Sequence, residues 1–230
     1  MARREPLSRE KVLDAALALA DEEGLEGLSM RRLAKTLGVE AMSLYNHVSN
    51  KADILDGVAE RVFSQVERPD PALPWHEQVR QVALSTYQAF ARHPVVPLAL
   101  VTDRSNPTSV RALEPLDGLA GALFQAGFDD VGAWRALGAV NGLVFGCLLM
   151  STGGFSGDPD RHAGQENVGA YIREMDPVAL PHFSRLLRGT QRDVTPEADF
   201  EQALNMLIIG LIAEAKRIQP DDQPSLSACE

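Results

Sequence analysis

The 230-residue sequence predicts an all-α protein, with a small N-terminal domain followed by a larger helical domain. Apolar residues recur three and four positions apart along most of the chain, and no segment of convincing strand length alternates in polarity. The stretch "RPDPALP" at 68–74 holds three prolines and is the best domain boundary. We therefore expect domains at 1–67 and 68–219, followed by a disordered tail at 220–230.

Three short helices are expected at the N-terminus. The first is amphipathic, capped by Ser8 and ended by Gly24. The second is capped by Ser29 and ended by Gly38, because glycine adopts the positive φ that lets a chain turn after a helix. The third covers 40–47 and has a polar outer face.

The remaining helices follow the same logic. Asn50 is expected to cap a fourth helix that runs to about Glu67, with Asp53 as its capping-box partner. Beyond the prolines, the predicted helices are 75–92, one that begins at Asn106–Pro107, a buried one over Ala136–Met150, and 196–218. The Gly- and Asp-rich piece at 152–167 is expected to be a long loop.

Targeting signals are not apparent. The N-terminus has basic residues without the apolar stretch of a secretory signal. The run Ala136–Met150 is shorter than the roughly 20 apolar residues that a membrane helix needs. Two cysteines suggest neither a disulfide framework nor a metal knuckle. We therefore expect a cytoplasmic protein with no membrane span.

The charge is unevenly distributed. The formal net charge is -10, yet the window 29–51 holds four basic residues against Glu40 alone, a local charge of +3. Screening limits the reach of distant charges to about 10 Å at moderate salt. An acidic chain with one basic edge is therefore compatible with binding to nucleic acid.

The residues from 29 to 51 have the pattern of a helix-turn-helix, whose second helix enters the major groove of DNA. Ser43, Tyr45 and Asn46 offer short donors that suit phosphates and base edges. Spacing alone also fits a helical hairpin whose polar face meets water, or an adaptor that uses this face on a protein partner. Binding to a short palindrome that weakens with salt discriminates these hypotheses.

Residues 8–66 resemble the DNA-binding domain of the TetR family of bacterial transcription regulators. The matching text is "VLDAALALADEEGLEGLSMRRLAKTLGVEAMSLYNHVSNKADILDGV". The resemblance implies that Tyr45, His47 and Lys51 contact backbone phosphates and that Arg31 contacts phosphate or a guanine edge. It also places four residues at positions that read bases: Ala41, Met42, Ser43 and Asn46.

The same resemblance implies a ligand-responsive regulator, most simply a repressor, that binds a palindromic double-stranded DNA operator as a homodimer and is released by a small hydrophobic effector. The last two long helices of each subunit would form a four-helix bundle, and glycines at 138, 142 and 146 would let backbones approach. The candidate pocket residues are Tyr87, Phe90, Leu100, Arg104, Phe124, Phe128, Trp134, Asn141 and Phe145.

Other chemistries have weak signals. The sequence has no phosphate loop, nucleophile elbow or paired metal motif, so we expect neither an enzyme nor a cofactor. "DPDRH" at 158–162 is interpreted as a solvated loop and not as a metal site. The segment 94–105 contains no histidine, which argues against sensing of a metal–tetracycline complex. Cys147 is interpreted as a small core residue.

Overall fold

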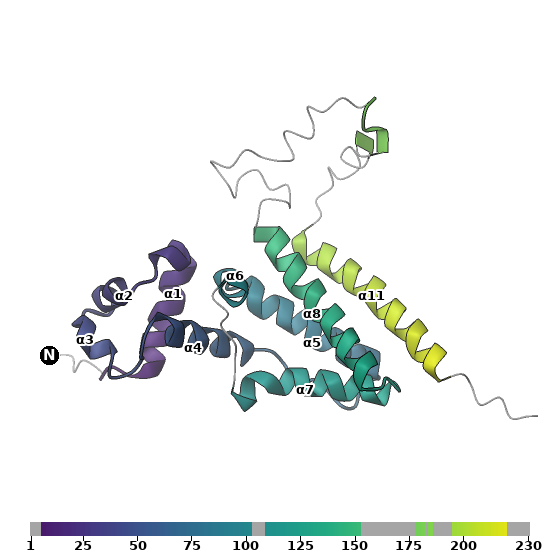
Figure 1. The fold of residues 1–230 in the computed structure, drawn as a ribbon, viewed down its shortest axis with the longest axis horizontal. Helices are drawn as coiled ribbons and strands as arrows, with labels where there is room; N and C mark the ends of the chain where they lie inside the picture. Colours follow the sequence, from purple (N-terminus) through teal and green to yellow (C-terminus); the bar gives the residue numbers. More distant parts are fainter. Residues whose placement is uncertain (1–5, 103–108, 153–177, 183, 186–194, 220–230) are drawn as a thin grey trace, which may run out of the picture.

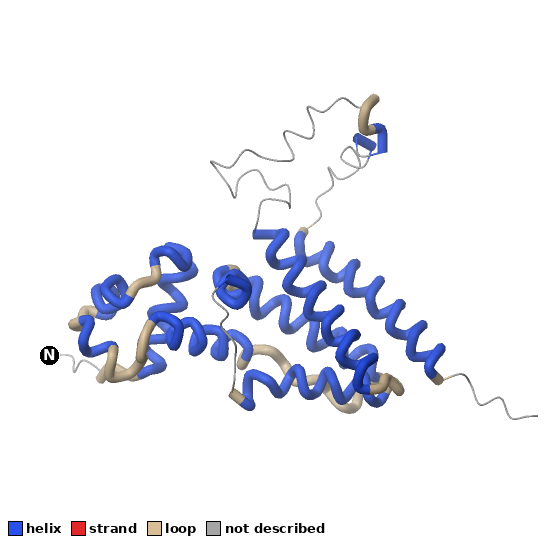
Figure 2. Tube along the Cα trace, in the orientation of Figure 1, coloured by secondary structure: helices blue, strands red, loops and turns tan. Residues whose placement is uncertain are grey.

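The computed structural model describes residues 6–102, 109–152, 178–182, 184–185 and 195–219, and the regular elements in these ranges are all helical (Figure 2). This confirms the predicted all-α class. The helices are α1 (Arg9–Gly27), α2 (Met30–Leu37), α3 (Ala41–Leu44), α4 (Lys51–Phe63), α5 (Trp75–Ala91), α6 (Val95–Thr102), α7 (Val110–Gln125), α8 (Asp130–Thr152) and α11 (Pro196–Ile218).

The helices form two groups (Figure 1). The first three lie together at one end of the molecule, and α4 extends from them toward the second group, in which α5 packs on α7, α8 and α11. Helix α6 contacts α1 and α4 on one side and α8 on the other, so it joins the two groups. A hydrogen bond between His93 Nδ1 and Asp21 Oδ2, at 2.7 Å, adds a polar contact at this junction. The domain limits 1–67 and 68–219 stay a prediction.

The expected caps are present. Side-chain oxygens of Ser8, Ser29, Asn50 and Thr195 each accept a hydrogen bond from a backbone N–H three residues later. Each bond satisfies one of the four amides that a helix leaves unpaired at its start. Gly38 has φ 64°, the left-handed conformation that the turn after α2 requires. The local signals in the sequence therefore located these ends correctly.

Three predicted helix ends differ from the structure. Helix α1 continues to Gly27, although Gly24 has φ 75° and breaks the helical conformation inside it. Helix α3 has only four residues, because the chain tightens into a turn in which the N–H groups of His47 and Val48 both donate to the Leu44 carbonyl. Helix α4 ends at Phe63, before the predicted Glu67.

The start of α7 is also corrected. This helix begins at Val110, and Ser109 Oγ caps it by accepting from the Ala112 N–H at 3.3 Å. The predicted start at 106–107 lies outside the described residues. So do the predicted loop from 153 onward and the predicted tail at 220–230.

The prediction for α8 was wrong in two respects. This helix spans Asp130–Thr152, so by length and composition alone it is long and apolar enough to cross a membrane. This differs from the prediction made from the shorter run Ala136–Met150. It is also not buried all round, since only 28% of its most apolar window is covered. The buried side faces α5, α7 and α11, which leaves an apolar outer side uncovered in the single chain.

Candidate nucleic-acid interface

The inner side of the helix-turn-helix is apolar and closely packed. Leu33 on α2 and Leu44 on α3 are fully buried, and Val48 after α3 is nearly so. The turn between the two helices closes with hydrogen bonds from Gly38 N to the Lys35 carbonyl and from Val39 N to the Ala34 carbonyl. These contacts orient α3 so that its remaining side chains point outward.

The outer side of α3 carries large exposed side chains. Met42 is 73% exposed and Tyr45 is 49% exposed, which is unusual for residues of their apolar area. Asn46 is exposed, and Ala41 and Ser43 are half-buried beside it. The structure therefore exposes two of the predicted base-reading residues, Met42 and Asn46, on one short surface, the α3 face (residues 41–46), whereas Ala41 packs against the core.

Basic side chains on α2 flank this face. Arg31 is exposed, and within the part of the chain that the structure describes its side chain has no hydrogen-bonding partner. Arg32 instead pairs with Glu23 on α1, and this bond raises the pKa of the Arg32 guanidinium. The α2 residue predicted to contact phosphate is thus available, whereas its neighbour is held by α1.

Lys51 has a partner that the sequence analysis did not foresee. Its Nζ donates to the Leu25 carbonyl at 2.8 Å, close to the C-terminal end of α1. An ammonium is favourable there because the last carbonyls of a helix are unpaired and carry partial negative charge. The predicted phosphate contacts of Tyr45, His47 and Lys51 stay predictions, and the structure gives Lys51 a bond within the protein as well.

A second cationic contact holds the α3–α4 turn (residues 45–50). Arg9, on the first turn of α1, forms an ion pair with Asp53 at 2.6 Å and also donates to the His47 carbonyl at 3.0 Å. Asp53 Oδ2 accepts from Ser49 N at 2.7 Å, so the expected capping-box partner bonds one residue before Asn50. The sequence analysis did not identify Arg9, because its partner Asp53 lies 44 residues further along the chain and no local pattern links the two residues.

Electrostatics agree with this geometry. The hydrogen bond from Arg9 holds the pKa of the Asp53 carboxyl below its usual value of 3.8; the Ser49 N–H adds to this effect and burial opposes it. The same bond raises the pKa of the Arg9 guanidinium. The pair is therefore fully ionised at neutral pH.

The predicted pocket residues divide into a packed set and an exposed set. Tyr87 stacks on Phe200 with ring centroids 4.2 Å apart, and Phe90 packs edge-to-face on both Phe63 and Phe145. Phe128 is buried against Trp75 in the same manner. These rings fill space in the core of the second domain, and Leu100 and Asn141 lie half-buried around it.

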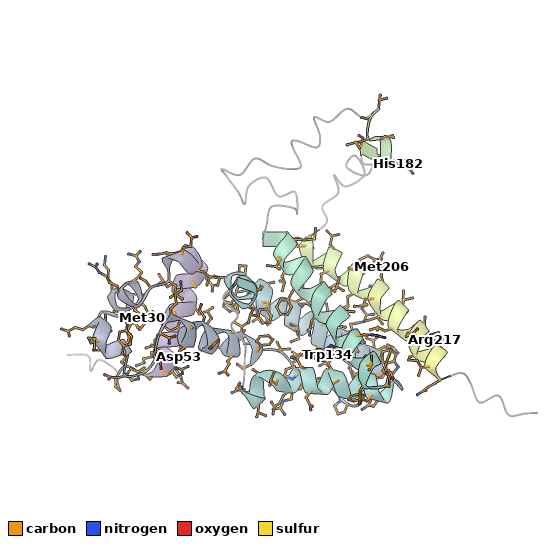
Figure 3. The ribbon with its side chains drawn as sticks, viewed as in Figure 1. Met30, Asp53, Trp134, His182, Met206 and Arg217 are labelled. Atoms are coloured by element: carbon orange, nitrogen blue, oxygen red, sulfur yellow. The ribbon has the colours of Figure 1, made fainter. Side chains whose placement is uncertain are left out.

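Phe124 and Trp134 do not line the interior, which corrects their assignment to an internal pocket. Phe124 on α7 is 50% exposed, and Trp134 on α8, which Figure 3 labels, is 75% exposed. Aromatic spacing along a helix indicates a shared face but not which face turns inward, and this is the reason for the error. Arg104 lies outside the described residues.

The structure has a groove of about 1150 Å³ between the two domains. We name it the interdomain groove. Its walls come from α1, α5, α6, α8 and α11. Of the predicted pocket residues that the structure describes, only Tyr87 lines it. Its other lining residues include Asp21, Leu25, Gln88, Arg92, Leu149 and Glu197. Local periodicity does not reveal such a site, because it depends on how α1 sits against the second domain.

Metal and thiol chemistry find no support in the part of the chain that is described. Those residues contain no group of three or more His, Cys, Asp or Glu side chains able to hold a metal ion, while "DPDRH" at 158–162 lies outside them. Burial raises the pKa of the Cys147 thiol, with a smaller contribution from Asp199. A thiol with a raised pKa is a poor nucleophile at neutral pH.

Comparison with known proteins agrees with this architecture. The chain is 33% identical over 143 residues to the HTH-type transcriptional repressor DrrR1 of Streptomyces coeruleorubidus, a match to 61% of this chain and about half, 52%, of that repressor's length. It is 28% identical to the tetracycline repressor protein class C of Escherichia coli, over 94% of both chains.

A solved structure is similar over most of the chain. The Streptomyces coelicolor TetR family protein ActR, in complex with actinorhodin, superposes with a TM-score of 0.73 at 28% identity, covering 91% of this chain and 99% of ActR. The family model "Bacterial regulatory proteins, tetR family" matches residues 12–58, and "Tetracyclin repressor-like, C-terminal domain" matches residues 68–215. The chain therefore belongs to the tetR family of bacterial regulatory proteins.

Proposed function

We propose that this protein is a homodimeric transcriptional repressor that binds a palindromic DNA operator through the α3 face and is released by a small hydrophobic effector. The observation that carries the proposal is the α3 face itself. Met42 on α3 and Tyr45 and Asn46 directly after it are exposed together, while Leu44 between them is buried. An amide suits an adenine edge and an apolar side chain suits a thymine methyl group.

The proposed dimer is supported by the uncovered sides of α8 and α11. A methyl group added at Gly138, Gly142 or Gly146 would meet no atom within 4 Å in the single chain. On α11, the helix that packs beside α8, Met206 (Figure 3) is 63% exposed and Ile209 is 67% exposed. Two copies placed face to face bury these sides, and a two-fold pair supplies two heads for half-sites roughly 34 Å apart.

We place the effector in the interdomain groove. Residues from α1 form one wall, and residues from α5, α8 and α11 form the others, so a bound molecule touches both domains. Arg92 and Gln88 offer polar contacts, while Leu25 and Leu149 offer apolar ones. ActR is solved in complex with actinorhodin, and this supports actinorhodin as the first compound to test. A ligand that separates α1 from α5 changes the spacing of the heads.

Operator binding is tested by selecting fragments from random DNA with the purified protein. We expect a palindrome, bound with an affinity that falls steeply as salt rises. Asn46→Ala is expected to relax the base preference at one position of each half-site and to leave non-specific binding unchanged. Selection of no common sequence by the wild-type protein would contradict the proposal.

Release is tested by adding actinorhodin and a panel of small hydrophobic compounds to the protein–operator complex. Leu149→Trp fills the groove and is expected to abolish release while operator binding is kept. Leu113→Trp is the matched control, because Leu113 lies exposed on α7 and does not line the groove. Equal release from both variants would move the effector site elsewhere.

The alternative hypothesis, a helical adaptor that binds protein through α3 and binds no operator, is not favoured by the family match. The salt titration also separates the two. An adaptor has no phosphate counterions to release, so its partner binding lacks the steep salt dependence of DNA binding.

A further inference from the structure

Arg9 connects three segments of the N-terminal domain. It lies on the first turn of α1, and its guanidinium reaches the α3–α4 turn and the first turn of α4. One Nη donates to the His47 carbonyl at 3.0 Å and to Asp53 Oδ2 at 3.2 Å, while the other donates to Asp53 Oδ1 at 2.6 Å. An arginine–carboxylate pair of this two-bond kind fixes orientation as well as distance.

Asp53 extends the network into the turn itself. Its Oδ2 accepts from Ser49 N at 2.7 Å, and its own N–H donates to Asn50 Oδ1 at 2.9 Å. The turn is therefore held at three successive places: the His47 carbonyl by Arg9, the Ser49 amide by Asp53, and the Asn50 side chain by the start of α4. Figure 3 shows Asp53 at this junction.

Close packing of α4 on α1 makes the reach of Arg9 possible. A methyl group added at Gly57 would lie 2.7 and 2.8 Å from the two methyl carbons of Leu13 and 3.3 Å from Arg9 Nη2. Glycine at 57 thus lets the two helices approach until the guanidinium spans the remaining gap. The ion pair is part of the packing geometry between α1 and α4.

The network matters because α3 is too short to hold its own position. A helix of four residues has almost no internal hydrogen bonding, so its placement depends on the contacts at its two ends. Buried Leu44 anchors it in the core, and the α3–α4 turn, which Arg9 holds, begins directly after Leu44 and contains Asn46. A change in this turn therefore moves the base-reading side chains.

We infer that Arg9 is a positioning residue for operator recognition: through the His47 carbonyl and Asp53 it fixes the α3–α4 turn, and with it the approach of Met42 and Asn46 to the bases. The inference rests on the proposed DNA-binding function. It assigns sequence selectivity to a residue that touches no base.

The competing explanation is a direct contact between Arg9 and a DNA phosphate, since the side chain of Arg9 is 45% exposed. The two explanations differ in salt dependence. Loss of a phosphate contact lowers the slope of log affinity against log salt by about one unit. Loss of a positioning contact leaves the slope unchanged and reduces the preference for the operator over random DNA.

The test measures binding of full-length wild-type, Arg9→Ala and Asp53→Asn proteins to the selected operator and to random DNA over a range of salt. We expect both variants to lose about tenfold or more in operator affinity, the equivalent of one base contact. We also expect unchanged salt slopes and no loss of affinity for random DNA. Asp53→Asn is informative because it removes a negative charge and so strengthens any purely electrostatic attraction to DNA.

Arg61→Ala is the matched control. Arg61 forms an ion pair with Asp14 at 2.7 Å that joins the same two helices, away from the α3–α4 turn. We expect operator affinity to equal that of the wild type. Thermal melting checks folding, and we expect shifts of no more than about 4 °C for all three variants, because exposed ion pairs contribute little stability.

Three results would overturn the inference. The first is wild-type operator affinity in Arg9→Ala. The second is a slope lowered by about one unit in Arg9→Ala together with undiminished operator affinity in Asp53→Asn, which would assign Arg9 to a phosphate. The third is equal loss in Arg61→Ala, which would reduce Arg9 to a general tie between helices. If the wild-type protein selects no operator at all, the proposed function fails and the inference fails with it.

Discussion

In the proposed operator complex, single residues on the α3 face decide which bases are recognised. Met42 has 73% of its area exposed to water, so covering it on a thymine methyl group is favourable, and Asn46 brings both a donor and an acceptor. Neither residue contributes to the packing of the domain, which relies on Leu33 and Leu44. Binding specificity and stability are therefore carried by different residues of the same short segment.

Lys51 has two candidate roles that one substitution separates. We expect Lys51→Ala to weaken binding to every DNA sequence and to lower the salt slope by about one unit, because a phosphate contact is lost. The measurement is affinity against salt for operator and random DNA. A loss of stability with unchanged slope and affinity would instead assign Lys51 solely to the Leu25 carbonyl that it bonds at 2.8 Å.

The ionisation of Asp53 reports directly on its contact with Arg9. The pKa of this carboxyl lies below 3.8 in the folded protein, so the stability it contributes is present above pH 3.8 and is lost as the pH falls through the folded pKa. We expect Arg9→Ala to raise the pKa of Asp53, as measured by NMR titration of its side-chain carbon. An unchanged titration would mean that the Ser49 N–H alone lowers the pKa.

At the scale of elements, the helix-turn-helix depends on one backbone conformation. Gly38 ends α2 in the left-handed region, and the hydrogen bonds of its turn direct the chain into α3. A side chain at this position clashes with the following carbonyl. The turn therefore requires glycine for steric reasons, and the angle between α2 and α3 follows from it.

Gly38→Ala is expected to lower the free energy of unfolding by about 1 kcal/mol. Gly121→Ala is the control, because Gly121 lies inside α7 and an added methyl group meets nothing within 4 Å. We expect that change to raise the free energy of unfolding by about 0.5–1 kcal/mol, since alanine loses less entropy in a helix. Urea unfolding monitored by circular dichroism measures both, and equal effects would refute the assignment of strain to Gly38.

At the scale of the whole molecule, two surfaces other than the α3 face are proposed to control DNA binding. The outer sides of α8 and α11 are apolar and uncovered in one chain, and the interdomain groove joins α1 to the helices that carry those sides. Helix α6 and the hydrogen bond between His93 and Asp21 connect the same parts. In the proposed dimer, a ligand in the groove and a partner on α8 therefore both act on the relative position of the two heads.

Gly142→Leu tests the proposed dimer. Gly142 is exposed, and a Cβ added there meets no atom within 4 Å inside one chain, so the monomer is expected to fold, whereas a second copy cannot approach α8 as closely. We expect a shift from dimer to monomer in sedimentation and a large loss of operator affinity, because each half-site is then bound alone. Gly121→Leu, on α7, is the control and is expected to stay dimeric. A dimeric Gly142→Leu protein would place the interface elsewhere.

The sequence by itself determined the helical class, the caps at Ser8, Ser29, Asn50 and Thr195, and the left-handed turn at Gly38. It also carried the family resemblance. These features depend on neighbours within about four residues, and local patterns record such neighbours. The short length of α3 escaped prediction because its end is set by a turn.

Only the tertiary structure decided which residues far apart in the sequence contact one another. It brought Arg9 to Asp53 and Lys51 to Leu25, turned Trp134 outward, and opened a groove between α1 and α5. Each of these results depends on the distance and angle at which helices pack, and ridge-and-groove packing allows several solutions for one apolar stripe. The choice among them comes from all the helices together, and therefore no single stretch of sequence contains it.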